Sequence, residues 1–276
     1  MKINMIKFDC IKLVKKSIPM FIAVFIFAGM VCIYYRGKYM DYNEGLIARH
    51  ENVTESIPDL QTNDYILYMF RGMELIDKEN PDDKVDIPIL YVGLAAIFSY
   101  IVFACLIQKD DYIIISYSGS RKRWLVGRML GIVINIFVII LEFVLAALIF
   151  GKGKLGFMSQ ESSYLIAYDF NKVTSMGIMF KMLFTLFLTV TAISMLQIMI
   201  TVIVDMIPAF LVSIAVYIIS LFYNSYVFIG NGTMFQRYSY FLNSGLNTSI
   251  VAIIDVCIIF ICIFISLLFI KKKDIL

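Results

Sequence analysis

The sequence predicts an all-α integral membrane protein with six membrane-spanning helices. Of its 276 residues, 61% are apolar and 16% are charged, whereas a soluble domain has about 45–50% apolar and about 25% charged residues. The apolar residues fall into six runs, each near the roughly 20 residues that a helix needs to cross a bilayer. Basic residues gather in three short segments beside these runs. This pattern excludes a soluble enzyme, a disordered chain and a nucleic-acid-binding protein.

Each apolar run is predicted to form one helix of a single transmembrane domain that covers residues 1–276. The predicted spans are 17–35, 87–107, 124–150, 177–204, 207–223 and 250–270. The fourth and fifth runs are nearly fused, and Asp205 and Pro208 separate them. Because proline cannot donate a backbone hydrogen bond inside a helix, we expect a tight hairpin there.

Positive charge predicts the orientation of the bundle, because short cytoplasmic segments of membrane proteins are rich in Lys and Arg. The N-terminal segment, the connection between spans two and three, and the C-terminal segment hold thirteen basic residues together, counting Arg128 at the start of the third span. Six spans place all three segments on one side. The 36–86 loop holds twelve acidic and six basic residues. We therefore expect a multi-pass protein with both termini in the cytoplasm and the 36–86 loop outside.

The segments outside the spans are also patterned. In the N-terminal stretch, Ile3, Ile6, Cys10, Leu13 and Val14 share one helical face, which predicts an amphipathic helix in the inner membrane interface. In the outer loop, residues 64–77 are compatible with a short amphipathic helix, with Ile66, Met69, Phe70 and Met73 on one face. The aromatic 224–247 segment is predicted to be interfacial or re-entrant at the outer surface.

Signatures of bond-making chemistry are absent from the sequence, so no catalytic residue is assigned. It has neither a G-x-S-x-G nor an H-E-x-x-H pattern, and Gly151-Lys152-Gly153-Lys154 lacks the spacing of a nucleotide-binding Walker A loop. One histidine, His50, cannot build a His-based metal site. We expect no enzyme activity, metal or cofactor in this chain.

Three ionisable residues, Glu142, Lys181 and Asp255, lie inside apolar runs. Such residues are costly in a bilayer and usually face a bundle interior or water. At about 1.5 Å per residue all three fall in the outer half of the membrane. One hypothesis is a polar cluster in which Lys181 pairs with Glu142 or Asp255; the other is separate snorkelling toward the interface.

The 108–124 connection is the most distinctive segment. It runs from Asp110, Asp111 and Tyr112 through three isoleucines and a serine-rich stretch to Arg121, Lys122, Arg123 and the sole tryptophan, Trp124. Such a segment can form a short helix parallel to the membrane. Its acids and aromatics would face a cytoplasmic partner, and its basic run would meet lipid phosphates.

This acid–Tyr–aliphatic–Ser–x–Ser–Arg–x–x–Trp arrangement before a long span resembles the loop of ABC-2 type transporter permease subunits. The most similar are small Gram-positive permeases linked to export of, or immunity to, peptide bacteriocins. The six spans, the tight hairpin, the aromatic outer segment and the Lys-rich tail agree in outline. The resemblance therefore covers the whole chain as architecture and one loop as a motif.

The resemblance implies a role for each part of the loop. The permease would have no nucleotide site, and ATP and Mg²⁺ would bind in separate cytoplasmic ABC ATPase subunits. A second permease copy or a related chain would complete the transporter in a bacterial cell membrane. The loop would form a coupling helix, with Asp110, Asp111 and Tyr112 contacting the ATPase and Arg121, Lys122, Arg123 and Trp124 anchoring it.

The cargo is inferred from composition. The chain holds 16 Met and 23 Phe, and its spans offer little polar lining for an ion or a sugar. This favours an amphipathic peptide or a lipid-like molecule. The alternative reading is a membrane sensor or assembly factor that binds its ligand through the acidic 36–86 loop; a secondary transporter would need polar residues at the bilayer midplane.

Overall fold

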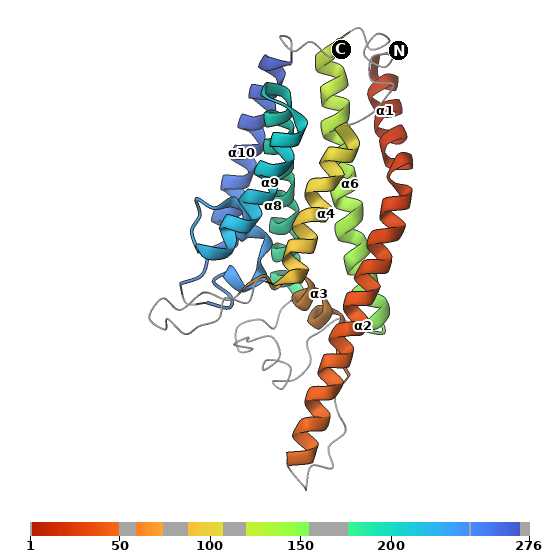
Figure 1. Ribbon diagram of the computed structural model, residues 1–276, viewed down its shortest axis with the longest axis vertical. Helices are drawn as coiled ribbons and strands as arrows, with labels where there is room; N and C mark the ends of the chain where they lie inside the picture. Colours follow the sequence, from red (N-terminus) through yellow and green to blue (C-terminus); the bar gives the residue numbers. More distant parts are fainter. Residues whose placement is uncertain are drawn as a thin grey trace.

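The protein is a bundle of long helices with a layer of short elements at one end (Figure 1). The computed structural model describes residues 2–49, 59–73, 88–106, 120–154, 176–242 and 244–270. Its elements are α1 (Lys2–Lys16), α2 (Ile18–Arg49), α3 (Thr62–Phe70), α4 (Ile89–Leu106), α6 (Arg121–Phe150), α8 (Met176–Ile203), α9 (Met206–Phe222), η3 (Ile229–Thr233), η4 (Phe235–Arg237) and α10 (Thr248–Phe269). The predicted all-α class is confirmed for these ranges, which contain no strand.

Five helices are long and apolar enough to cross a membrane: α4, α6, α10, Ile18–Asp41 of α2 and Gly177–Ile203 of α8. The fifth predicted span is also a helix, α9, but it has only 17 residues. At about 1.5 Å per residue α9 is about 25 Å long. The start of α1 and the end of α10 lie at the same end of the bundle, opposite α3, η3 and η4 (Figure 1).

The prediction of an N-terminal helix lying flat in the membrane interface is wrong for this structure. Figure 1 shows α1 running on into α2 along the long axis of the molecule. Hydrogen bonds cross the junction, because Ser17 N donates to Leu13 O at 3.0 Å and Phe21 N donates to Ser17 O at 2.9 Å. Cys10 and Leu13, two residues of the predicted apolar face of α1, are buried in the protein.

A small-residue stripe on α6 explains this placement of α1. Gly127 and Gly131 are four residues apart, a spacing that lets two helix backbones approach closely. A Cβ added at Gly131 would lie 2.5 Å from Leu13 Cδ1. Cys10 Sγ donates to Gly127 O at 3.3 Å, and Leu13 is fully buried. The close approach thus buries Cys10 and Leu13, two of the residues that we expected to face the bilayer.

The predicted break between the fourth and fifth spans is confirmed. The Asp205 side chain caps α9 by accepting a hydrogen bond from Met206 N at 2.7 Å. Pro208 lies in the first turn of α9, where the backbone N–H that it lacks would have no helical partner. The chain therefore reverses between α8 and α9, which pack against each other.

The predicted 36–86 loop contains more helix than expected. The first span does not end at residue 35, because α2 continues as a helix to Arg49. The predicted 64–77 helix begins earlier, at Thr62, and ends at Phe70, while residues 74–77 lie outside the described residues. Every residue of α3 is buried. In the described ranges, no face of α3 is exposed to solvent, because the helix packs against α2, α4 and α6.

Candidate functional site

The predicted coupling connection is described only where it enters α6. Asp110, Asp111 and Tyr112 lie outside the described residues. Ser120 is extended and α6 begins at Arg121, so the predicted anchors Arg121, Lys122 and Arg123 form its first turn. Arg121 and Lys122 are half-buried and Arg123 is exposed. We had predicted the third span to start at Trp124, and its helix begins three residues earlier.

Trp124 and Arg128 lie at the end of the bundle where α1 and α6 start (Figure 1). Following the predicted orientation, we call this the inner end and the opposite end the outer end. Trp124 is 8% exposed, and the Arg128 guanidinium lies 5.6 Å from the centre of its ring. Arg128 is fully buried and donates from Nη1 to Cys105 O at 3.0 Å, at the carboxyl end of α4. A cation at the carboxyl end of a helix can donate a hydrogen bond to a backbone carbonyl and interacts favourably with the helix dipole. We had counted Arg128 only as topological charge, so its role as a buried link was missed.

Asn135 adds a second link about two turns deeper. Its Nδ2 donates to Ser17 Oγ at 3.0 Å and lies 3.2 Å from Cys105 Sγ. It therefore joins α6 both to α4 and to the junction of α1 with α2. We call Gly127, Arg128, Gly131 and Asn135 the inner polar face of α6. This face holds α1, α4 and α6 together directly beneath the two ends of the 107–119 connection.

The three intramembrane ionisable residues do not form the predicted pair. Asp255 is buried on α10, and its Oδ2 accepts a hydrogen bond from Thr189 Oγ1 of α8 at 2.5 Å. Lys181 is exposed, and Glu142 is half-buried on α6. Within the described ranges neither carboxylate lies within ion-pair distance of Lys181. The pairing prediction is therefore wrong for this structure; Asp255 joins α8 to α10 instead.

Residues 224–242 and 244–247, which we call the outer cap, close the other end of the bundle between α9 and α10. Arg237 is buried and donates from Nη2 to Leu221 O at 2.7 Å. Burial lowers the pKa of Arg237 to about 10, so its guanidinium stays charged at neutral pH. Tyr238 OH donates to Gly232 O at 2.6 Å. The Arg237 bond thus ties the cap to the end of α9, and the Tyr238 bond is internal to the cap.

Tyr91 connects the outer cap to α4. This residue is buried in the first turn of α4, and its hydroxyl lies 3.4 Å from Tyr217 O of α9 and 3.3 Å from Gly230 O of η3. Thr233 Oγ1 lies 3.1 Å from the same hydroxyl. The helix α4 is therefore held at its outer end by Tyr91 and at its inner end by Arg128.

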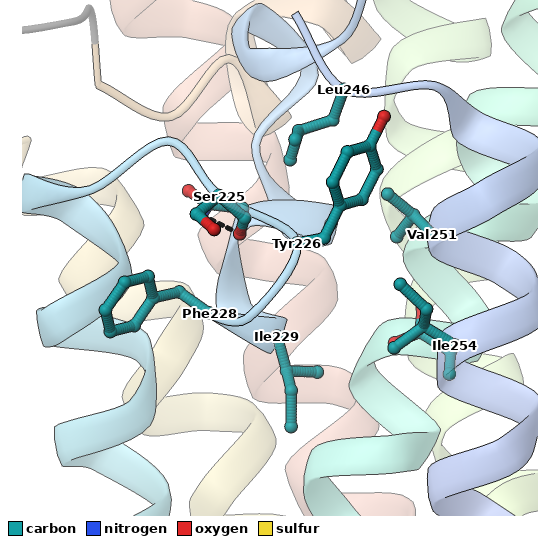
Figure 2. A pocket seen from close by; sticks show the side chains of 10 residues that line it. Ser225, Tyr226, Phe228, Ile229, Leu246, Val251 and Ile254 are labelled. Carbon is teal, nitrogen blue, oxygen red and sulfur yellow. Dashed lines mark hydrogen bonds between the residues drawn. The ribbon is translucent and has the colours of Figure 1, made fainter.

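The cavity beneath the outer cap is too small to hold a cargo molecule. Figure 2 shows Tyr226, Leu246, Val251 and Ile254 around it, between the segment after α9 and the start of α10. Its volume is about 10 Å³, which is room for about one water molecule. A pathway for a peptide or a lipid would need the surrounding helices to separate.

The short helix α3 bridges the two sides of the outer end. The Phe70 ring lies 5.4 Å from the Phe143 ring of α6 and 5.6 Å from the Phe235 ring of η4, measured between centroids. Gln236 N of the outer cap donates to Arg71 O at 3.1 Å. From the sequence, either a small cap over the bundle or a substrate-facing surface was compatible with the outer loop, and α3 packs against the end of the bundle.

No protein-family model, curated protein or solved structure matches this chain. Within the described ranges no three His, Cys, Asp or Glu side chains come together as metal ligands. A functional assignment therefore depends on the chain's own residues.

Proposed function

We propose that this protein is the membrane-spanning permease subunit of an ABC exporter. Two permease copies, identical or paired with a related chain, would dock separate cytoplasmic ATPase subunits through the 108–124 connection. The proposal includes six spans, with α9 as the fifth, and both termini in the cytoplasm of a bacterial cell. The cargo would be an amphipathic peptide or a lipid-like molecule, in export of or immunity to antimicrobial peptides.

The observation that supports this proposal most directly is the way α4 is fixed at both ends. Its inner end adjoins the proposed ATPase-binding connection and is bound by Arg128. Its outer end is bound to α9 and η3 through Tyr91. A force applied to the connection would therefore reach the outer cap through one rigid helix of 18 residues.

The inner polar face of α6 makes this transmission efficient. Arg128 and Asn135 tie α6 to Cys105, and Gly127 and Gly131 hold α1 against α6. Closure of the ATPase pair would displace α1, α4 and α6 together as one body. ATP would act as the ligand that favours one of two arrangements of the bundle. In the arrangement that ATP does not favour, α3 would close the outer end of the bundle.

The test is a pull-down of the tagged protein in mild detergent beside the variant Asp110→Lys/Asp111→Lys. We expect the wild type to retain a cytoplasmic ATPase that hydrolyses ATP, and the variant to lose it. Asp274→Lys is the control, because it reverses an acidic residue of the C-terminal segment, outside the connection. It should keep the ATPase bound. A well-folded wild type that binds no ATPase would contradict the proposal and favour a sensor that uses the 36–86 region.

A further inference from the structure

A second cavity lies at the outer end of α2, away from the outer cap and from the connection. It has a volume of about 70 Å³ and lies between α2, the start of α3 and the end of α6. Its lining includes Arg36, Tyr39, Asp59, Tyr65, Phe150 and Lys152. One water-sized group needs about 10–15 Å³ of such volume. The cavity therefore has room for about five such groups, which is about the number of phosphorus and oxygen atoms in a phosphate group.

The charges around this cavity are mainly positive. Lys152 Nζ pairs with Asp59 Oδ2 at 2.8 Å. This hydrogen bond and the nearby charges of Lys152, Lys154 and Arg36 hold the pKa of Asp59 below its usual value. Three cations thus surround one carboxylate. In the described part of the chain Arg36 has no carboxylate within ion-pair distance, so its charge is left for another anion.

A second carboxylate, Asp64, is buried in the first turn of α3, and its Oδ2 accepts a hydrogen bond from Gln61 N at 2.9 Å. Asp64 thus caps α3 and is not among the residues that line the cavity.

The depth of the cavity indicates what the anion is. Arg36 lies near the outer end of the candidate span Ile18–Asp41. Tyr34 is exposed beside it, and Tyr35 stacks on Tyr68 with ring centroids 4.2 Å apart. Aromatic rings of this kind gather at the level of lipid headgroups. Cations at the same level face the phosphates of the outer leaflet.

We infer that Arg36 and Lys152 form a binding site for the phosphate of an outer-leaflet phospholipid, with Asp59 as an internal competitor for Lys152. Tyr39, Tyr65 and Phe150 provide apolar surface for the glycerol and the first carbons of the acyl chains. Arginine can donate two parallel hydrogen bonds to a phosphate, whereas lysine contributes a point charge. When the lipid binds Lys152, Asp59 is released to water.

Lys152 offers a variant that removes the charge without disturbing the fold. Its φ is 52°, in the left-handed region that glycine adopts more readily than any other residue. Lys152→Gly therefore suits the backbone and deletes the ammonium group. Arg36 is exposed, so Arg36→Gln is also compatible with folding. Lys181→Gln is the matched control, because it removes an exposed cation near the start of α8.

The experiment counts the phospholipids that the purified full-length protein retains, by native mass spectrometry with added phosphatidylglycerol. We expect Arg36→Gln/Lys152→Gly to bind the lipid at least tenfold more weakly than wild type, and Lys181→Gln to bind within twofold of wild type. Asp59→Asn should bind more tightly, because the competing carboxylate is gone. Equal retention by wild type and the double variant would overturn the inference.

A parallel arm with inorganic phosphate distinguishes the lipid from the free anion. If the site is built for a lipid, inorganic phosphate at the same concentration leaves the bound phosphatidylglycerol in place, because it cannot use the apolar walls. Displacement of the lipid under these conditions would overturn the lipid assignment and leave a site for a free anion.

Discussion

Arg128 fixes the inner end of α4 to α6 through a charge-assisted hydrogen bond to Cys105 O. The substitution Arg128→Lys keeps the charge but shortens the reach to Cys105 O. A lost buried hydrogen bond from a charged group costs about 1.5–3 kcal/mol, so we expect a lower free energy of unfolding by that amount. Thermal unfolding in detergent measures it.

Arg123→Lys is the control for this prediction. Arg123 lies one turn away on the same helix but is exposed, and surface substitutions usually change stability by less than about 0.5 kcal/mol. Equal effects of the two substitutions would show that the guanidinium of Arg128 does not hold α4.

Asp59 predicts a pH-dependent contribution to stability at the outer end. Its pKa in the folded protein is lowered, chiefly by the hydrogen bond from Lys152. A lowered pKa stabilises the folded state above the ordinary Asp value of about 3.9, and this stabilisation is lost as the pH falls through the folded-state pKa. The unfolding midpoints of wild type and Asp59→Asn should therefore converge below about pH 4.

A second variant, Lys152→Gln, removes the donor of the hydrogen bond to Asp59. Its difference from wild type should shrink over the same pH range, because the main cause of the lowered pKa is gone. A constant difference between wild type and Asp59→Asn from pH 7 to pH 3 would contradict the prediction.

At the scale of elements, the start of α3 packs closely against the end of α6 through backbone atoms. A Cβ added at Gly151 would lie 2.5 Å from Thr62 N and 2.8 Å from Thr62 Cα. Because backbone atoms cannot move aside cheaply, Gly151→Ala should destabilise the protein by about 1–3 kcal/mol. We expect protease cleavage around α3 to become faster in this variant.

Gly29→Ala is the control for the effect of a methyl group in a membrane helix. A Cβ there would meet only Phe150 Cε2, at 3.9 Å, which is an ordinary contact. This variant should keep the stability and the protease resistance of wild type. If both alanines act alike, the contact of Gly151 with Thr62 does not hold α3.

Most helices could be predicted from the sequence, but the contacts between helices could not. The break at Asp205 and Pro208 was predictable, because capping and the missing proline donor act locally. The placement of α1 was not predicted, although the four-residue spacing of Gly127 and Gly131 carried a signal for close packing. Likewise, the burial of α3 depends on partners far away in sequence, Phe143 and Phe235. The pairing of Lys181 failed because its distance to each carboxylate depends on helix rotation.

At the scale of the whole molecule, the proposed function requires that movement at the inner connection reaches the outer cap. Tyr91→Phe removes only the hydroxyl that lies between Tyr217 O, Gly230 O and Thr233. We expect this variant to bind the ATPase and hydrolyse ATP normally, while cells that carry the transporter lose resistance to amphipathic antimicrobial peptides. ATP hydrolysis by the purified complex and survival on a peptide panel are the two measurements.

Tyr100→Phe is the matched control, since Tyr100 lies on the same helix but is exposed. It should retain both ATP hydrolysis and resistance. Full resistance in Tyr91→Phe would show that α4 does not transmit movement through this hydroxyl.

The unequal lengths of α6 and α9 have a consequence for the surrounding bilayer. The two helices have 30 and 17 residues, which correspond to about 45 and 25 Å, against a hydrocarbon thickness of about 30 Å. In the proposed six-span arrangement, lipids beside α9 would compress, while those beside α6 would stretch or the helix would tilt. The membrane surface would then slope around the protein, so acyl-chain length would act on the two sides with opposite sign. A bilayer of shorter chains relieves the elastic strain at α9 and increases it at α6.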